Sequence, residues 1–360
     1  MLRRRLRQFW DMCWTNGFLL SAVVCLTLLY LVALFAGFVS PYHYDNEDRT
    51  RSYHPPTRIH VFDDGRLTRP HVREYELTFD EDYRRVFVPV EGVRHDLRLF
   101  VRGDTYSFLG LLEWDLHLFG VGEEGRIYLL GADSRGRDLL SRIAYGAQVS
   151  MTIGLVGVAI ALLFGLLLGG ISGYYGGWID TVIQRSTEII MIIPGFFLLL
   201  ALRAAFPPDW DSIRVYFFII VILSFIGWAS LARVIRGMVL SLREKEFVAA
   251  ARVLGAPDRF IITRHLIPNT ASYFVVYASI SIPGYILGES ALSLLGLGIQ
   301  DPHASWGNLL QEAMSITQIQ LHPWILLPGF FIFVAVMSFN IVGDALRDLL
   351  DPQQEVTTTI

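Results

Sequence analysis

Residues 246–269 read EFVAAARVLGAPDRFIITRHLIPN and lie between two long apolar runs. From Glu246 to Leu254 every residue tolerates a helix, and three consecutive alanines occupy the middle. Gly255 is placed to end this helix as a C-cap, and the proline two residues later can open a second helix. The second helix is expected over Asp258–Leu266, with Pro268 ending it. The stretch therefore predicts two short helices that meet at a glycine.

Two interpretations of this stretch are open. A segment that only joins two membrane spans is usually short and rich in turn residues. This stretch keeps helical character over its whole length and carries both charged and small apolar residues. Small residues on a helix allow another helix to approach closely. The pattern therefore favours a docking surface over a plain connecting loop.

The composition indicates membrane spans together with a sizeable polar portion. Of the 360 residues, 53% are hydrophobic, and the mean hydropathy is +0.44. The net charge is −4 and no basic stripe with interleaved aromatic residues is present, so nucleic acid is not an expected partner. No nucleophile–base pair or metal-ligand spacing is present in the sequence, so an enzyme is the least favoured class.

The lysine content bears on the energy source. Lys245 is the only lysine in the chain, and Glu246 follows it. A phosphate-binding loop needs glycines, then lysine, then serine or threonine, and this sequence has no such run. We therefore expect this chain to bind no nucleotide cofactor. Because metal-ligand spacing is also missing, we expect no bound metal. If ATP drives its activity, another subunit binds the ATP.

Six membrane spans are expected. An arginine cluster precedes the apolar run at about 17–39, which is too long for a signal peptide and long enough to span a bilayer. The arginines place the N-terminus in the cytoplasm. The other expected spans are 149–171, 189–206, 215–234, 271–299 and 323–342. Six crossings put both termini and the 246–269 stretch on the cytoplasmic side.

The segment between the first two spans differs in kind. It is polar, and short alternating runs predict a small β-rich external domain. Asp63-Asp64-Gly65 is a hairpin signal. The strands are expected at 58–62, 74–79, 85–90 and 97–101, and the histidines at 54, 60, 71, 95 and 117 are expected to be solvated. The expected domains are 1–40 (N-terminus and first span), 41–130 (external insert), 131–346 (transmembrane core with the cytoplasmic loop 237–269) and 347–360 (cytoplasmic tail).

Several residues in the predicted spans are candidates for particular roles. Gly165, Gly169 and Gly173 recur every four residues and are expected to pack against another helix. Pro194, Pro283 and Glu289 are candidates for a translocation path, because an acid within a membrane segment is costly and often functional. Two alternatives remain: the prolines produce ordinary kinks, and Glu289 lies near the outer interface as a cap or a partner. Residues 131–148 are expected to form an interfacial helix whose arginines reach lipid headgroups.

The 246–269 stretch resembles the cytoplasmic EAA loop of binding-protein-dependent ABC transporter permeases. That pattern is Glu-Ala-Ala, three residues, Gly, and nine residues to a short run ending in Pro. Ala250, Ala251, Gly255 and Pro268 match it, whereas Ala249 stands where the family often has Glu. The flanks at 131–146, 289–298, 305–308, 343–348 and 351–352 are similar to the second, C-type permease of oligopeptide, dipeptide or nickel importers. The insert is longer than is common in close relatives.

The resemblance implies an all-α membrane protein of the type I ABC importer fold in the inner membrane, with the β-rich insert between its first two helices. It implies a heterodimer with a homologous permease, two cytoplasmic ATPase subunits that bind ATP and magnesium, an external solute-binding protein, and membrane lipid. The loop would couple the ATPases to the channel. The residues expected to carry this coupling are Glu246, Ala250, Ala251, Gly255, Asp258, Arg264 and Pro268.

Other functions remain open from the residues alone. The solute is a peptide or, alternatively, nickel or another small solute. An ion-coupled secondary carrier would need ionisable groups inside the bundle, for which Glu289 and Arg203 are the candidates. A membrane scaffold acting through its external domain is a third possibility. The residues that line the path and the role of the insert are not predicted by the sequence.

Overall fold

The computed structural model describes residues 2–350, except residues 64, 65, 82, 84, 109, 123, 124, 208 and 209. Asp351-Pro352, Asp64-Gly65 and the side chain of Arg203 therefore lie outside what is described. The chain forms two compact units. The first comprises Met1–Leu26, Thr152–Glu289 and Val334–Ile360, and the second comprises Thr27–Met151 and Ser290–Phe333.

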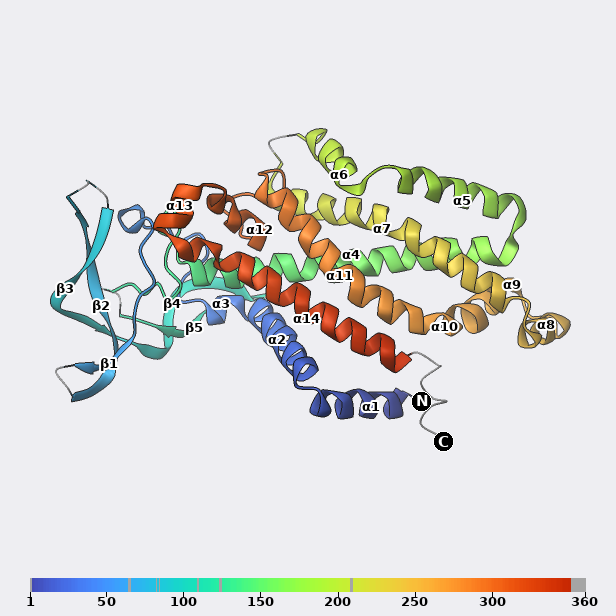
Figure 1. Ribbon diagram of the computed structural model, residues 1–360, viewed down its shortest axis with the longest axis horizontal. Helices are drawn as coiled ribbons and strands as arrows, with labels where there is room; N and C mark the ends of the chain where they lie inside the picture. The colour runs from blue at the N-terminus through green and yellow to red at the C-terminus, as the bar shows by residue number, and fades with distance from the viewer. Residues whose placement is uncertain are drawn as a thin grey trace. The chain divides into compact units, whose positions relative to one another are not determined.

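Helices make up most of the structure, and most of the long ones are apolar (Figure 1). The principal helices are α1 (Leu2–Thr15), α2 (Gly17–Leu34), α4 (Leu139–Tyr175), α5 (Gly177–Ile192), α6 (Gly195–Ala204), α7 (Ser212–Leu242), α11 (Ala271–Leu294) and α14 (Leu327–Leu350). Within the described residues, five helical segments are long and apolar enough to cross a membrane. There are up to six if the bent pair α5 and α6 is one broken span. The chain is thus a helical membrane protein, as predicted.

The bounds of several helices differ from the prediction. The first span is α2 followed by the short α3 (Ala36–Val39), with a break at Phe35. α4 runs without interruption from Leu139, so the residues expected to form a separate interfacial helix belong partly to it. Asp138 caps its start, because the Oδ2 atom accepts hydrogen bonds from the Ser141 backbone N–H and hydroxyl, both at 2.7 Å.

The third expected span is bent. Helix α5 already begins at Gly177, ahead of the expected start at residue 189, and the α5–α6 pair bends by 83°. Pro194 explains the bend, since it lacks an N–H donor and disfavours helical geometry in the residue before it. Ile193 is accordingly extended, with a ψ of 122°. Figure 1 shows α5 and α6 as separate segments on either side of this break.

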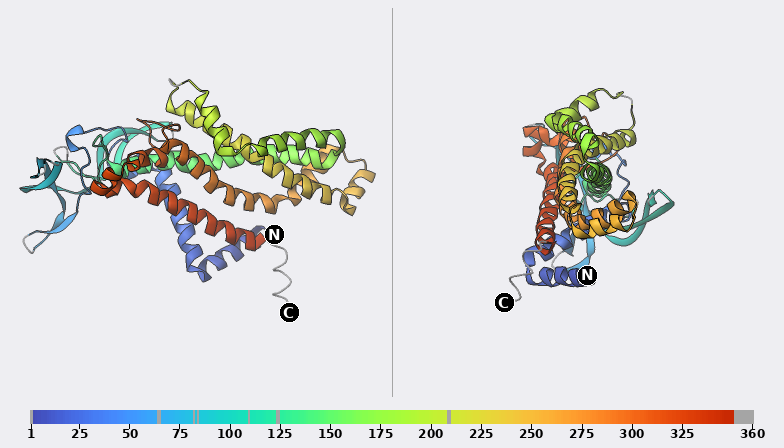
Figure 2. Two further views of the ribbon diagram at one scale, coloured as in Figure 1. Left: turned by 45° about the horizontal axis from the view of Figure 1, so that its top comes forward. Right: turned by 90° about the vertical axis from the view of Figure 1, so that its right-hand side faces the viewer.

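Figure 2 shows α4 and α7 running side by side. The three glycines of α4 contact α7. A Cβ on Gly169 would lie 2.5 Å from the carbonyl oxygen of Ala232, and one on Gly173 would lie 2.7 Å from that of Arg236. A Cβ on Gly165 would lie 2.6 Å from Leu231. The two backbones therefore approach too closely for any side chain at these positions.

The described residues of the second unit form five strands and several short helical turns. The strands are β1 (His60–Asp63), β2 (Arg66–Phe79), β3 (Arg85–Asp96), β4 (Arg98–Phe108) and β5 (Leu112–Gly120), and the turns are η1 (Arg49–Arg51), α12 (Trp306–Leu309), η3 (Leu310–Met314), α13 (Ile316–Leu321) and η4 (Pro323–Leu326). β1, β2 and β3 form one antiparallel sheet, and β4 pairs with β5. The predicted β-rich insert is therefore present. Asp63 pairs with Arg66 across the expected hairpin, whose turn residues are not described.

Three of the five histidines that were expected to be solvated are instead buried. They are His54, His71 and His117. Their ring nitrogens lie at hydrogen-bonding distance from backbone carbonyls, which removes the cost of burying a polar ring. For example, Nδ1 of His117 lies 2.5 Å from the carbonyl oxygen of Ser40. In the part of the chain that is described, no group of His, Cys, Asp or Glu has metal-binding geometry.

Candidate functional site

The coupling segment, defined here as residues 246–269, begins with α8 (Glu246–Val253). Gly255 follows with a φ of 76°, in the left-handed region where glycine is favoured. Its N–H donates to the carbonyl of Arg252, and the N–H of Ala256 donates to the carbonyl of Ala251, both at 3.0 Å. These two bonds make a Schellman motif. The predicted glycine C-cap is therefore confirmed.

The second half of the segment differs from the prediction. It consists of α9 (Asp258–Phe260), a π-helical stretch η2 (Ile261–Leu266) and α10 (Ile267–Asn269). Pro268 does not end the helical run but lies in the first turn of α10, where a missing N–H is tolerated. The wider π turn comes directly before it. Only Thr270 separates α10 from the start of α11.

One face of the coupling segment is buried against α4 and α7. Val248 and Ala251 of α8 and Ile261, Ile262 and Leu266 of η2 share a core cluster with Leu231, Ile235 and Val239 of α7 and Tyr174 of α4. Ala251 therefore faces the core and lies away from the exposed surface. The other candidate coupling residues are exposed: Glu246, Ala250, Gly255, Asp258, Arg264 and Pro268.

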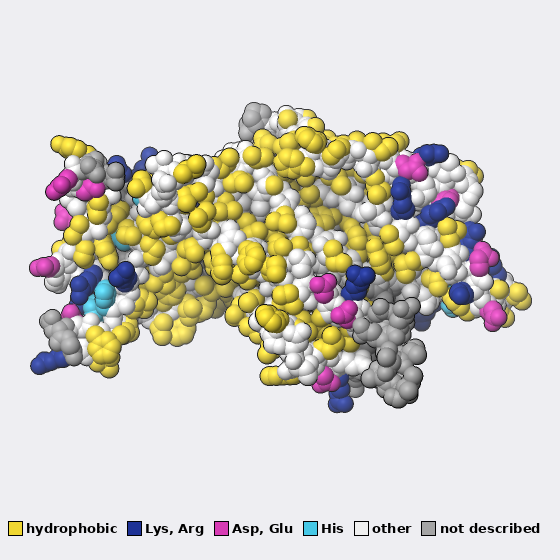
Figure 3. All heavy atoms as spheres, viewed as in Figure 1, with side chains coloured by type: hydrophobic (Ala, Val, Ile, Leu, Met, Phe, Trp, Pro, Cys, Tyr) yellow, Lys and Arg dark blue, Asp and Glu magenta, His cyan; other side chains and the backbone are white. Residues whose placement is uncertain are grey.

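The tip of the segment presents two large apolar side chains that the sequence reasoning missed. Val253 is 87% exposed and Leu254 is 85% exposed. They immediately precede Gly255, and this position next to the predicted C-cap was the available signal. Burial of such a side chain in a partner contributes about 1.5–3 kcal/mol. In Figure 3, charged side chains gather around this end of the first unit, whereas the helix flanks are largely hydrophobic.

Tyr174, near the end of α4, contacts both halves of the coupling segment. Its hydroxyl donates to Oδ1 of Asp258 at 2.6 Å. The guanidinium of Arg252 lies over its ring, 5.2 Å from the centroid, as a cation–π contact. Tyr174 is itself buried in the core cluster. One side chain thus links α8 and α9 to the transmembrane helix α4.

Ion pairs fix the neighbouring ends of α4, α5 and α7. Asp180 of α5 accepts two hydrogen bonds from Arg236 of α7, at 2.8 and 2.5 Å. Ser172 of α4 also donates to Asp180, at 2.5 Å. Nη1 of Arg243 donates to the carbonyls of Gly173 and Tyr174, at 3.2 and 3.3 Å, and so satisfies backbone acceptors at the end of α4. These contacts join the ends of α4, α5 and α7 next to the coupling segment.

A groove of about 420 Å³ runs along α6, α7 and α11 in the first unit. It is lined by apolar side chains, by glycines, and by the polar residues Ser230, Tyr277, Ser281 and Tyr285. Pro194, Pro283 and Glu289 do not line it, but the glycine next to each of them does: Gly195, Gly284 and Gly288. Glu289 itself is fully buried.

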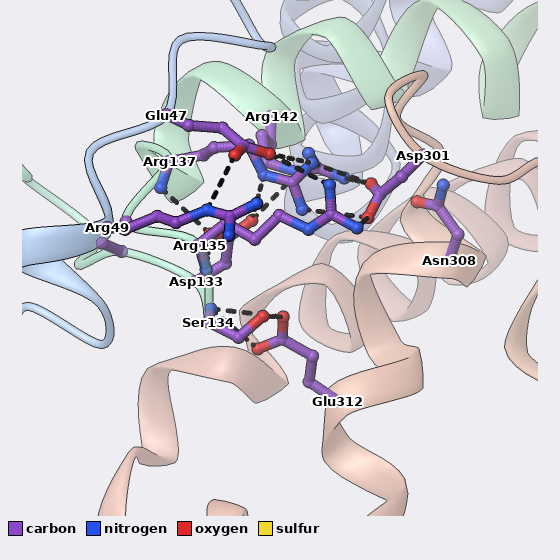
Figure 4. A network of polar contacts seen from close by, with 12 residues as sticks. Glu47, Arg49, Asp133, Ser134, Arg135, Arg137, Arg142, Asp301, Asn308 and Glu312 are labelled. Carbon is purple, nitrogen blue, oxygen red and sulfur yellow. Dashed lines mark hydrogen bonds and ion pairs between the residues drawn. The ribbon is translucent and has the colours of Figure 1, made fainter.

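The second unit contains a cluster of ion pairs that the sequence reasoning did not predict (Figure 4). Arg137 donates to Oδ2 of Asp133 at 2.7 Å and to Oδ1 of Asp301 at 2.9 Å. Arg142 donates to the same Asp301 oxygen at 2.8 Å. Arg137 and Arg142 are both buried. The expectation that these arginines extend to lipid headgroups is therefore wrong, because each has carboxylate partners inside the protein.

The cluster shifts the acidity of its carboxyl groups. Burial raises the pKa of Asp301, but hydrogen bonds from Arg137 and the charge of Arg142 outweigh it, so the pKa lies below its ordinary value. Asp138 lies next to the cluster, and burial raises its pKa to about 7 despite its hydrogen bonds with Ser141. The alternation of aspartate and arginine through residues 133–142 was the sequence signal for this cluster.

Comparison with protein families gives two matches. Residues 161–356 match the family described as binding-protein-dependent transport system inner membrane component. Residues 5–56 match the N-terminal TM domain of oligopeptide transport permease C. The first match alone covers more than half of the chain, and it includes the whole coupling segment.

Three curated relatives illustrate the similarity. The oligopeptide transport system permease protein OppC of Haemophilus influenzae is 42% identical over 242 residues, which are 67% of this chain and 75% of that protein. The dipeptide transport system permease protein DppC of Alkalihalophilus pseudofirmus is 39% identical over 226 residues, 62% of this chain and 72% of its own length. OppC of Escherichia coli K12 is 41% identical over 227 residues, 63% of this chain and 72% of that protein.

The fold, the coupling segment and these matches agree. The apolar helices are those of a multi-pass inner-membrane protein, and the matched family is a transmembrane subunit rather than an enzyme. ATP hydrolysis in such systems belongs to partner ATPase subunits, and a solute-binding protein delivers the solute. The chain belongs to the family of inner-membrane permease components of binding-protein-dependent ABC transport systems.

Proposed function

We propose that this chain is a permease subunit of an ATP-driven importer of oligopeptides or dipeptides. The observation that carries the proposal is the coupling segment, which has one face buried against α4 and α7 and an exposed apolar tip at Val253 and Leu254. The peptide substrate is supported by relatives named as oligopeptide and dipeptide permeases at about 40% identity.

The proposed topology has six spans, with α5 and α6 counted as one broken span. Both termini and the coupling segment lie in the cytoplasm, and the β-rich insert lies outside. The arginines that flank the segment support this orientation, because cytoplasmic loops carry an excess of basic residues. Arg236, Arg243, Arg252, Arg259 and Arg264 all lie in or near it.

The proposed assembly contains a homologous permease, two ATPase subunits and a solute-binding protein, all embedded in or bound at the inner membrane. ATP and magnesium are bound by the ATPase subunits, and this chain binds neither. Val253 and Leu254 insert into a groove of one ATPase, and exposed Glu246, Asp258 and Arg264 surround that contact. Glu246 supplies the acidic side chain that is missing at position 249, where this chain has alanine and the family often has glutamate.

Coupling follows from this geometry. When ATP closes the ATPase pair, the docked tip moves, and the buried face of the segment carries α4 and α7 with it. ATP acts by favouring one of two packed arrangements through contacts that differ between them. The groove along α6, α7 and α11 is this chain's part of the translocation path. Its hydroxyl groups suit the N–H and C=O groups of a peptide backbone.

The experiment compares two substitutions of Gly255 in the complete transporter reconstituted into proteoliposomes. Gly255→Val places a β-branched residue in the left-handed region, where it is strongly disfavoured, so we expect peptide uptake per ATP hydrolysed to fall at least tenfold. Gly255→Asn is the control, because asparagine tolerates this conformation. There is open space around the position, so the control introduces no clash.

Two outcomes contradict the proposal. Wild-type proteoliposomes that take up no peptide when ATP and binding protein are supplied would reject the peptide assignment. Mass spectrometry of the solute that copurifies with the complex then identifies the actual substrate. Normal uptake by Gly255→Val would instead reject the role of the coupling segment and leave the substrate assignment intact.

A further inference from the structure

The hairpin formed by β4 and β5 has one apolar and one polar face near its tip. Tyr106 pairs with Trp114, and Phe108 pairs with Leu112, so these four side chains share one face. The next pair, Ser107 with Glu113, points to the opposite face. The strands are antiparallel, and the tip lies between Phe108 and Leu112. The paired residues next to the tip of the hairpin therefore form an amphipathic segment.

This hairpin is attached to the end of the first membrane span. β4 and β5 both contact α3, which follows α2 directly (Figure 1). The ring of Tyr106 occupies the space that a side chain at Gly37 would need. The rings of Phe35 and Phe108 are stacked, with centroids 5.6 Å apart. Both contacts use the apolar face.

The order of these contacts sets the direction of the hairpin. From Ser40 back to Gly37 and then Phe35, the chain moves toward the apolar body of α2. Ser40 contacts His117, Gly37 contacts Tyr106, and Phe35 contacts Phe108. On the hairpin, these three partners lie progressively closer to the tip. Two strand residues advance about 6–7 Å. The tip therefore extends from the end of the span back toward the membrane rather than into water.

The tip exposes large apolar side chains. Leu111 is 82% exposed, Leu112 is 65% exposed, and Trp114 is 52% exposed. A contiguous apolar patch of this kind marks an interaction site rather than an ordinary surface. Tryptophan and tyrosine are enriched where a protein meets lipid headgroups, because one end of each side chain is apolar and the other is polar.

We propose that the tip of the β4–β5 hairpin inserts its apolar face into the lipid bilayer beside the end of the first span. Continuity with that span favours lipid over a protein partner, since the same apolar face packs on Phe35 and Gly37. The strand edges at the tip are unpaired among the described residues and need hydrogen-bond partners, so the backbone of the tip stays at the headgroup level. The apolar side chains, Leu112 among them, reach below it into the acyl chains. The hairpin thus tethers the insert to the membrane surface.

The test measures the membrane depth of single spin labels in the complete transporter. Cys13 and Cys25 are replaced by serine, and a nitroxide is attached at Leu112→Cys or at the control Glu113→Cys. These neighbours lie on opposite faces and are both exposed. The complex is placed in nanodiscs of phosphatidylethanolamine and phosphatidylglycerol. Collision rates are measured with oxygen, which concentrates in lipid, and with a water-soluble nickel chelate.

The two labels are expected to behave oppositely. At residue 112, oxygen should relax the label several-fold more than the nickel chelate does, and at residue 113 the nickel chelate should dominate. Dominance of the nickel chelate at both positions overturns the proposal, because the tip then lies in water. Protection of residue 112 from both reagents also overturns it, since protein then covers the tip. Leu111→Cys repeats the measurement if Leu112→Cys does not assemble.

Discussion

Tyr174 joins the coupling segment to the membrane domain through two different interactions. Its hydroxyl bonds to Asp258 of α9, and its ring carries the guanidinium of Arg252 of α8. The two helices on either side of Gly255 therefore share one attachment to α4. A change of angle between them must either move α4 or break one of these contacts.

Tyr174→Phe should weaken this link without disturbing the core. The ring and its contact with Arg252 remain, but the hydrogen bond to Asp258 is lost, which costs about 1 kcal/mol. We expect peptide uptake per ATP hydrolysed to fall severalfold while the melting temperature changes little, as measured in proteoliposomes and by thermal unfolding. Tyr175→Phe is the control, because Tyr175 is the neighbouring tyrosine and is half exposed. An equal effect of both substitutions would contradict the role of Tyr174.

Asp301 is the residue on which the ion-pair cluster of the second unit depends. It pairs with two arginines that are both buried, so Asp301→Asn leaves Arg137 and Arg142 without this partner. We expect a loss of about 3 kcal/mol at neutral pH, at the lower end of the range for buried pairs because Asp301 is partly exposed. Asp63→Asn, which removes a surface pair with Arg94, should cost about 0–1 kcal/mol.

The pH dependence of this loss follows from the lowered pKa of Asp301. A carboxyl whose pKa is lower in the folded than in the unfolded protein stabilises the folded state at pH values above its ordinary pKa of 3.8. That stabilisation is lost as the pH falls through the pKa of the folded state. The difference in unfolding free energy between wild type and Asp301→Asn should therefore narrow below pH 3.8. Denaturant unfolding at a series of pH values measures this, and a difference that is independent of pH would reject the assignment.

At the level of elements, the contact between α4 and α7 depends on the absence of side chains. Gly169→Ala brings a methyl group to 2.5 Å from the backbone of Ala232, which can only be relieved by separating the helices. We expect a loss of about 1–3 kcal/mol, measured by thermal unfolding in nanodiscs. At Gly170 the nearest atom to a Cβ is 3.7 Å away, so Gly170→Ala should be neutral or slightly stabilising. Similar losses for both would contradict this packing.

The helices that the sequence predicted best are those whose boundaries have local chemical signals. Gly255 ends α8 because a left-handed residue is needed there, and glycine supplies it. Pro194 was read as a residue inside a span, and a proline alone does not predict that the chain bends by as much as 83° there. Pro268 was read as a stop, although a proline is equally compatible with the first turn of a new helix.

The ion-pair cluster shows why part of the site was not predicted. Arg137 and Arg142 looked like surface residues near a membrane, and their local sequence is compatible with that interpretation. Their burial depends on Asp301, which lies far along the chain and meets them only in the folded state. Val253 and Leu254 present the converse case, because large apolar side chains are usually buried and these two are exposed.

At the level of the whole molecule, the insert between the first two spans contains two parts of different importance. The segment before β1 is built into the second unit: Glu47 bonds to Arg135 at 3.0 Å, and the carbonyl of Asp48 occupies the space beside Gly136. His54 accepts a backbone hydrogen bond from Ala132 at 2.8 Å. By contrast, the described residues at the end of the β2–β3 hairpin, 78–81, 83, 85 and 86, are exposed.

Two deletions separate these parts. Replacing residues 45–120 with a Gly-Ser linker removes the contacts of Glu47, Asp48 and His54, so we expect little folded permease in the membrane. Replacing residues 79–85 with Asn-Gly keeps the Thr78–Val86 pair and closes the hairpin with a two-residue turn, so it should leave the protein intact. Size-exclusion profiles of fluorescent fusions extracted from membranes measure both. A profile for the 45–120 deletion that matches wild type in amount and sharpness would show that the segment before β1 is dispensable, because the second unit then folds without it.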